Sequence, residues 1–328
     1  MHAAAINLRG GVSPRNARLR GQSIIEYVLI AAVIGLVVVF AGPQISGAIR
    51  NQFSQVTNTV DSGTDGDSFM SDEEKALREA MKTVAQKEAK DWTLDEQKAA
   101  AIDIAKNGTS SVVYAKAKAA MDAGTKWSVK LTDGRTMQYS IIGINHDDLA
   151  DGSGKAGLTF LTTGAGGYVG LTTSARMNAT DTNVGGWEKS ELRQKMNGGE
   201  IWNMLPADLQ SKVKSVRKLT NNIGGLDKNA AVTTTTDKLF LLSRSEITKD
   251  PNNIWPSWTG YSWLGAEGVQ YEGRACVNLH PKALTRSAAP GSSTRFVDNY
   301  DKQVSSAGPT EPTANASRTM IVYAAFCF

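Results

Sequence analysis

The sequence is poor in cysteine and histidine: its 328 residues include only Cys276 and Cys327, and three histidines. Two cysteines are too few for a disulfide-rich scaffold or a zinc-ribbon site. An exported domain could form one bridge, and spacing alone leaves open whether the two thiols meet. The sequence also lacks a nucleophile elbow, a Walker loop and a dinucleotide-binding fingerprint. We therefore predict a protein that is not an enzyme and that carries no cofactor.

The chain has no net positive charge outside the N-terminus. Four arginines (Arg9, Arg15, Arg18 and Arg20) precede the first acidic residue, Glu26, and account for the formal net charge of +4. The rest of the chain is balanced and shows no basic stripe. We therefore predict no nucleic-acid partner, because such binding needs clustered cations.

An apolar segment follows the arginines directly. Residues 28–41 carry no charge, and from Ile24 onward the segment approaches the length of a membrane-spanning helix. The arginines would hold the leader in the cytoplasm. An ordinary secretory signal cut near Ala41-Gly42-Pro43 and a plain membrane anchor are both alternatives. Glu26 argues against both, because a carboxylate in an apolar segment is costly and usually functional.

The run Gly21-Gln22-Ser23-Ile24-Ile25-Glu26-Tyr27 resembles the processing site of Flp/Tad-type pilins, which have class III signal peptides. The resemblance covers about residues 15–56. It implies cleavage by a prepilin peptidase between Gly21 and Gln22, with Glu26 as the fifth mature residue and Tyr27 typical of the Flp branch. In a filament, Glu26 would pair with the α-amino group of a neighbouring Gln22.

This resemblance also implies a location and partners. The precursor would insert in the inner (cytoplasmic) membrane, and the mature protein would reach the cell surface or a type IV pilus by binding other pilin subunits. Simple Flp pilins are little more than the N-terminal helix, whereas a large region follows here. That difference favours a decorated or minor subunit over the bulk shaft subunit.

Composition and local motifs predict five regions: a leader (1–21), a hydrophobic pilin-type helix (22–60), a linker (61–70), a helical spacer (71–124) and a C-terminal α+β domain (125–328). Within the spacer, Ser71-x-x-Glu74 and Thr93-x-x-Glu96 are capping boxes that open helices. Gly108 and Gly124 stand where helices should end.

The C-terminal domain begins with alternating apolar residues on both sides of Asp133-Gly134, which predicts a hairpin. Further strands are expected at 158–161, 238–242 and 320–328, and helices at 190–197 and 206–219. In this prediction, the end of the chain supplies a core strand.

Four phrases in this domain, at residues 141–152, 185–193, 205–210 and 237–243, are together similar to a domain of unknown function common in surface proteins of gut bacteria. The arginine–serine turn at 285–287, the hairpin beginning at 295–299 and the final strand at 319–328 follow the same plan. The resemblance covers about residues 125–328. It implies a fold related to C-type-lectin-like domains and formylglycine-generating enzymes. The predicted fold class is therefore α+β, with a long N-terminal apolar helix, a helical spacer and a loop-rich lectin-like domain.

The densest polar cluster comprises Asn145, His146, Asp147, Asp148 and Asp151. His and carboxylates can bind calcium or zinc, but a turn closed by Asp151-Gly152, with His146 capping a backbone group, is favoured. We predict no metal. Nothing in the sequence supports an acid–base pair of His146 with His280. Cys327 lies in an apolar strand, where a thiol is more often inert or half of a disulfide than reactive.

Aromatic residues crowd one short segment that contains Trp255, Trp258, Tyr261 and Trp263. Exposed on a loop, they could stack on a host or surface glycan or anchor a protein. Alternatively, they fill a loop-rich core, which is slightly favoured.

The leading functional hypothesis is a pilin-like subunit that displays an adhesion or binding domain at the cell surface. The alternatives are a membrane-anchored surface binding protein outside filaments and a surface-displayed enzyme.

Overall fold

A computed structural model of the protein describes residues 71–248, 256–277, 279–280, 282–298 and 313–328. They belong to one compact unit that extends from Gly63 to Phe328. The predicted leader (1–21), pilin-type helix (22–60) and linker (61–70) lie outside the described residues.

The predicted fold class needs correction. It includes a long apolar N-terminal helix, but in the described part of the chain no helix is long and apolar enough to cross a membrane. The longest described helix, α4 (Leu94–Asn107), has 14 residues. The described residues have an α+β fold of short helices packed on small, mainly antiparallel sheets.

Three helices begin this unit: α3 (Asp72–Val84), α4 and α5 (Tyr114–Ala123), with short 3₁₀ turns η2 (Ala89–Asp91) and η3 (Gly108–Ser110) between them. Both predicted capping boxes are present, so the first orphaned backbone N–H groups of α3 and α4 are satisfied by side chains. Gly108 and Gly124 end α4 and α5 with φ values of 56° and 66°, as predicted.

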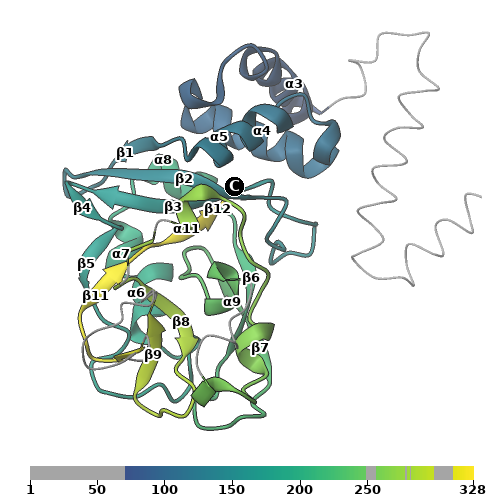
Figure 1. The fold of residues 1–328 in the computed structure, drawn as a ribbon. Helices are drawn as coiled ribbons and strands as arrows, with labels where there is room; N and C mark the ends of the chain where they lie inside the picture. Colours follow the sequence, from purple (N-terminus) through teal and green to yellow (C-terminus); the bar gives the residue numbers. More distant parts are fainter. Residues whose placement is uncertain (1–70, 249–255, 278, 281, 299–312) are drawn as a thin grey trace, which may run out of the picture. The chain divides into compact units, whose positions relative to one another are not determined.

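These helices are not a spacer, contrary to the prediction. They cover one side of the main sheet, as Figure 1 shows, and share its hydrophobic core. Tyr139 in the sheet donates to Gln97 Oε1 of α4 at 3.1 Å. A Cβ on Gly157 would lie 1.8 Å from the carbonyl oxygen of Ala101, so helix and strand meet where only glycine fits. The charged residues that led to the spacer prediction lie on the exposed faces of the helices. The alanine-rich opposite face of α4 packs against the sheet.

The main sheet has the strand order β1-β2-β3-β12, with β4 paired to the far end of β3. Its strands are β1 (Trp127–Lys130), β2 (Thr136–Ile144), β3 (Leu158–Ala165), β4 (Tyr168–Val169) and β12 (Ala325–Cys327). The predicted hairpin at Asp133-Gly134 joins β1 to β2, and Gly134 has the positive φ (87°) that the turn requires.

Within the described residues, three smaller antiparallel sheets complete the strands: β10-β9-β8, β11-β5 and β6-β7. Their bounds are β5 (Thr172–Ala175), β6 (Val216–Asn221), β7 (Val232–Asp237), β8 (Leu284–Ala288), β9 (Arg295–Asp298), β10 (Thr313–Asn315) and β11 (Met320–Val322). The remaining helices are α6 (Glu191–Asn197), α7 (Glu200–Asn203), α8 (Ala207–Lys212), α9 (Arg244–Ile247), α10 (Trp263–Ala266) and α11 (Arg274–Val277), with the 3₁₀ turn η4 (Pro256–Trp258).

Three local predictions differ from the structure. The helix expected at 206–219 ends at Lys212, and residues 216–221 instead form strand β6, which pairs with the β-branched run of β7. The strand expected at 238–242 is replaced by the preceding threonine-rich β7, and Phe240 makes only a single bridge, to Ala325. The arginine–serine turn at 285–287 is the middle of β8.

The end of the chain does supply a core strand, but in two pieces. β11 pairs with β5, and β12 then pairs with β3 in the main sheet. The switch occurs at Ala324, whose N–H donates to Thr162 Oγ1 at 2.9 Å. Phe326 and Phe328 pack on Phe160, with ring centroids 5.3 and 5.0 Å away. The last residues of the sequence are therefore central to the core.

Candidate functional site

Several of the sequence-predicted site residues lie outside the described residues. They are Gly21, Gln22, Glu26, Tyr27 and Trp255. The structure places the others in three separate locations: the 145–151 segment, the aromatic segment and the two cysteines.

The polar segment that follows β2 is a turn with one inward side chain. Asp151 Oδ1 accepts the backbone N–H and the hydroxyl of Ser153, at 2.9 and 2.7 Å, and so closes the turn. His146 Nε2 lies 3.0 Å from the carbonyl oxygen of Val269, the backbone contact expected of it. Asp148 forms an ion pair with Lys155 on the surface. No group of three His, Cys or carboxylate side chains that could hold a metal is found in the described part of the chain.

Asp147, by contrast, points into the protein and begins a network of buried charges. Its carboxylate accepts from Lys218 Nζ at 2.7 Å, from the hydroxyl of Tyr271 at 2.8 Å and from Thr159 Oγ1 at 2.6 Å. Lys218 also pairs with Glu246 Oε1, at 2.5 Å. The lysine therefore joins the turn after β2 to helix α9.

Arg286, in the middle of β8, continues the network and is fully buried. Its Nη1 pairs with Glu246 and donates to the carbonyl oxygen of Leu241 at 2.7 Å. Its Nε donates to Thr220 Oγ1 at 2.9 Å, and its Nη2 to the carbonyl oxygens of Glu267 at 2.7 Å and Leu219 at 3.1 Å. All five N–H donors of the guanidinium are thus used, which is the condition for burying such a group without a large penalty.

The third acidic member is Glu267, which is fully buried. Its Oε1 accepts from the backbone N–H of Asn221 at 3.0 Å, and its Oε2 is bonded to the hydroxyl of Ser287. Burial raises the pKa of Glu267 to about 7, against the opposing effects of Ser287 and Arg286. We call Asp147, Lys218, Glu246, Glu267 and Arg286 the buried ion cluster.

The other acids of the buried ion cluster stay charged. Burial alone would raise the pKa of Asp147, but the charge of Lys218 and the contact with His146 hold it well below its usual value. Burial likewise opposes ionisation of Glu246, and the charges of Arg286 and Lys218 lower its pKa. Lys218 has a raised pKa despite burial, because Asp147 and Glu246 face it. With Glu267 protonated, the cluster is electrically neutral.

The buried ion cluster is a clamp and offers no route for a substrate. Its five residues are only 0% to 4% exposed. The cluster ties together the turn after β2, strand β6, helix α9 and strand β8. The sequence pointed to Asp147 as a member of the polar cluster at 145–151 and to Arg286 only within the predicted turn at 285–287, whereas Lys218, Glu246 and Glu267 were not predicted as site residues.

In its described part, the aromatic segment belongs to the hydrophobic core and does not form an exposed binding surface. Trp258, Tyr261 and Trp263 are 0%, 6% and 1% exposed. They form a second, smaller hydrophobic cluster with residues of β8 and β9. Trp263 Nε1 donates to the carbonyl oxygen of Asp227 at 3.0 Å, and the rings of Tyr261 and Trp263 meet edge to face. The side chains that would stack on a sugar are thus already packed against the protein.

The two cysteines are free thiols and both are buried. Cys327 lies beside the buried ion cluster, 3.4 Å from Thr159 Oγ1. Burial, reinforced by nearby carboxylates, raises the pKa of both thiols. Neither is poised as a thiolate nucleophile. His280 accepts the N–H of Lys282, whereas His146 stacks on Tyr271, so the two histidines serve different local contacts.

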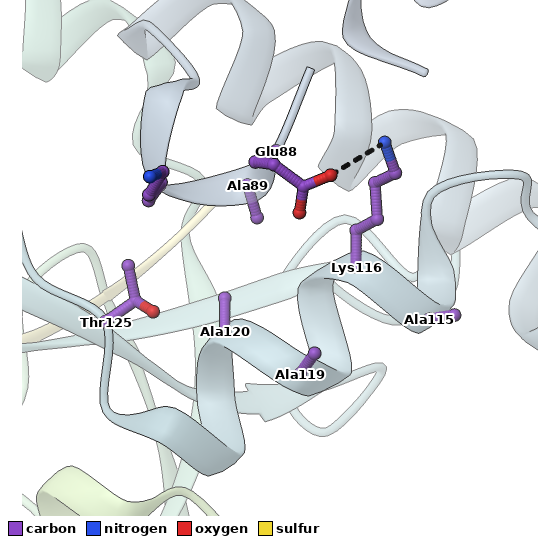
Figure 2. Close-up of a pocket in the computed structure, with 8 residues that line it drawn as sticks. Glu88, Ala89, Ala115, Lys116, Ala119, Ala120 and Thr125 are labelled. Carbon is purple, nitrogen blue, oxygen red and sulfur yellow. Dashed lines mark ion pairs between the residues drawn. The ribbon is translucent and has the colours of Figure 1, made fainter. Parts of the chain in front are cut away.

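A shallow surface hollow of about 540 Å³ lies between η2 and α5 (Figure 2). Figure 2 shows Lys116 reaching from α5 toward Glu88, with Nζ to Oε1 at 3.8 Å. The same ammonium donates to the carbonyl oxygens of Ala85 and Lys87, at 3.0 and 2.8 Å. Lys116 therefore fastens α5 to the end of α3, and much of the remaining wall is alanine.

Comparison with known families gives one match. Residues 157–308 match the model of a domain of unknown function, DUF6273. No curated protein and no solved structure matches the chain. Nothing in these comparisons tests the expected C-type-lectin-like architecture.

The matched range covers a little under half of the chain and is not a complete structural unit here. It contains Lys218, Glu246, Glu267 and Arg286, but their partner Asp147 precedes it. The strands β2 and β12, which flank β3 in the main sheet, and β1 beyond β2 also lie outside it. In this chain, the segment similar to the family is completed by residues on both sides.

Proposed function

We propose that the chain is an exported, pilin-like subunit of a Tad-class pilus that displays the unit described above at the cell surface for adhesion or binding. The observation that carries the proposal is the run from Gly21 to Tyr27, with Glu26 five residues after the glycine, behind four arginines and ahead of an apolar segment. Each feature has a defined use in processing or assembly, and their spacing along the chain resembles that of the Flp/Tad-type processing site.

The described unit suits the role of a carried domain. It has its own core, in which helices α3–α5 and the main sheet bury each other's apolar faces. A domain with a closed core can be placed on an assembling subunit without needing a partner to fold. In this role the domain lies outside the cell and binds a ligand through its surface.

The first test is the N-terminus of the mature protein, read by mass spectrometry. The proposal expects a start at Gln22, with residues 1–21 removed by a prepilin peptidase. A start near Gln44 would instead identify a conventional signal peptide and a secreted domain. An intact Met1 with membrane attachment would identify a plain anchor. Either result would overturn the proposal.

The second test separates a filament subunit from a membrane-tethered binding protein. Glu26→Ala should abolish incorporation into sheared filaments while membrane insertion of the precursor is retained, because the pairing with a neighbouring Gln22 amine is lost. Glu26→Asp, which keeps the carboxylate, is the matched control and should retain more assembly than the alanine variant. Normal filament incorporation of Glu26→Ala would favour the tethered binding protein.

A further inference from the structure

Three members of the buried ion cluster bring an amine into contact with two carboxylates. Lys218 Nζ lies 2.7 Å from Asp147 Oδ1 and 2.5 Å from Glu246 Oε1, and all three residues are at most 4% exposed. An amine and a carboxyl group can condense to an amide, and contact within one chain favours the condensation because effective concentrations reach about 10⁵–10⁸ M. Since both reactants belong to the chain, a closed site is no obstacle.

Aromatic rings close the site around the amine. The ring centroid of Phe240 lies 4.3 Å from Lys218 Nζ, and that of Tyr271 lies 5.5 Å away. Exclusion of water favours the neutral amine and acid, which are the reactive forms, and protects an amide from hydrolysis. The surface pair of Lys155 and Asp148 has a similar distance, 2.9 Å, but its side chains are 48% and 66% exposed, so it serves as an unreactive comparison.

The carboxyl group of Asp147 is held as an electrophile. The hydroxyl of Tyr271 donates to both of its oxygens at 2.8 Å, and Thr159 Oγ1 donates to Oδ2 at 2.6 Å. When an amine attacks the carbon of a carboxyl group, negative charge develops on an oxygen, and donors already in place stabilise that charge. Asp147 is therefore better prepared for attack than Glu246, whose Oε2 faces Arg286.

Glu246 is placed as a base. Its Oε2 pairs with Arg286 Nη1, whereas its Oε1 contacts the amine of Lys218. Arg286 also donates to the carbonyl oxygens of Leu241 and Glu267, which fixes the guanidinium and, through it, the glutamate. A carboxylate fixed in this way can take a proton from the amine and pass it to a leaving hydroxyl group.

We propose that Lys218 and Asp147 form an intramolecular amide bond after folding, with Glu246 as the general base. Proton transfer from the ammonium of Lys218 to the carboxylate of Asp147 gives the neutral pair, and Nζ then attacks Cγ to form the N–C bond. Glu246 takes a second proton from the nitrogen and gives it to the departing hydroxyl group. The Cγ–O bond breaks, and one water molecule leaves with both protons that Lys218 has lost. No oxidant or cofactor takes part.

The bond removes one positive and one negative charge from the interior and leaves Glu246 paired with Arg286. Despite burial, the mutual attraction of the two charges raises the pKa of Lys218 and lowers that of Asp147, so the neutral pair is a minor form and the bond forms slowly after folding. It ties the turn after β2 to strand β6 across 71 positions and restricts the unfolded chain as a disulfide does. This inference does not depend on how the protein is exported.

Peptide mapping of the full chain tests the bond. The protein, purified in mild detergent and kept folded overnight, is denatured, reduced and digested with trypsin, which cuts after lysine and arginine but not after an acylated lysine. The expected major product joins residues 136–155 to residues 218–228 and weighs one water molecule less than the two peptides together. Cleavage after Lys155, the lysine of the surface pair, is the control within the same digest.

Two outcomes of the digest would overturn the proposal. The first is recovery of residues 136–155 as a free peptide without any joined product. The second is a bond from Lys218 to Glu246, which would appear as residues 218–228 joined to residues 245–249. Fragmentation of the joined product by tandem mass spectrometry identifies the linked residues.

Variants then test the role of Glu246. Glu246→Gln keeps the shape of the side chain but cannot take up the proton, so the joined peptide should form at least about a hundredfold more slowly. Asp148→Ala, which removes the neighbouring exposed carboxylate, is the matched control and should form the bond at the parent rate. Circular dichroism checks folding, and the digest of the parent decides the proposal if Glu246→Gln does not fold. A folded Glu246→Gln variant that reacts at the parent rate would overturn the role of Glu246 as base.

Discussion

The buried ion cluster and the irregular stretch of β2 and β3 at Ser140 and Thr163 both place polar side chains inside an otherwise apolar fold, yet their polar atoms differ in one respect. In the cluster, Arg286 and Lys218 donate to partners within the chain. In the irregular stretch, the hydroxyls of Ser140 and Thr163 are buried and have no hydrogen-bond partner in the described part of the chain. Satisfied polar groups fix one structure, whereas a buried polar group without a partner lowers stability. The predictions below test this difference by removing corresponding groups from the two regions.

The largest effect is expected from breaking the buried ion cluster. Asp147→Ala leaves Lys218 with one fewer counter-charge in a site closed to water, and should lower the free energy of unfolding by about 3–5 kcal/mol. Asp148→Ala, the next residue, removes only an exposed ion pair with Lys155 and should cost less than about 1 kcal/mol. Urea unfolding of the full chain, followed by tryptophan fluorescence, measures both. Equal losses for the two variants would show that the cluster is no clamp.

The second effect is a dependence of stability on pH that arises from Glu267. Its pKa is raised from 4.5 to about 7 in the folded protein, so between these values the folded state keeps a proton that the unfolded state has lost. The free energy of unfolding should therefore fall by about 3 kcal/mol from this group as pH rises from 4.5 to 8. Asp147 and Glu246 act in the opposite direction only at lower pH, because their pKa values are lowered.

Glu267→Gln isolates this contribution. The amide has the shape of the carboxyl group, keeps an acceptor for the N–H of Asn221 and does not titrate. Melting curves between pH 5 and 8 should show a smaller loss of stability in the variant than in the parent. Identical slopes would mean that Glu267 does not hold its proton in this range.

Local features of the fold were predictable from the sequence, because the groups that specify them lie close together in the chain. Ser71 and Glu74 form a capping box, and Asp133-Gly134 turns a hairpin, within a few residues. The buried ion cluster was not predictable, because Lys218 meets Asp147 across 71 positions and Tyr271 meets it across 124. Only the three-dimensional fold brings such residues into contact.

Strand β6 shows why hydrophobic pattern alone misleads here. Val216, Lys218 and Thr220 face inward, whereas Leu219 is 41% exposed. A strand is normally oriented with its leucine inward, and that choice would have placed Lys218 in solvent. The ion pairs of Lys218 with Asp147 and Glu246 override the pattern. The unpaired hydroxyls of Ser140 and Thr163 likewise leave no signal in the sequence, since a serine or threonine without a hydrogen-bond partner looks like a bonded one.

The third prediction compares two threonines on the same strand. Thr159→Val removes the hydrogen bond to the charged Asp147 and should cost about 1.5–3 kcal/mol. Thr163→Val removes a hydroxyl that has no partner, so it should change the stability of the ligand-free protein by less than about 0.5 kcal/mol, or raise it. Both changes keep the shape of the side chain. Chemical unfolding of the full chain measures them, and a loss at Thr163 as large as that at Thr159 would show that its hydroxyl is bonded after all.

The smallest effect is expected from reducing agent. Cys327 lies against the buried ion cluster, while Cys276 belongs to helix α11, and both are free. The melting temperature should therefore change by less than about 1 °C when dithiothreitol is added, whereas loss of a disulfide would lower it by at least about 4 °C. Thiol counting in denaturant without reductant should find two reactive groups. A count of zero would establish a bridge, which would tie helix α11 covalently to strand β12 beside the buried ion cluster, so that neither element could be altered independently of the other.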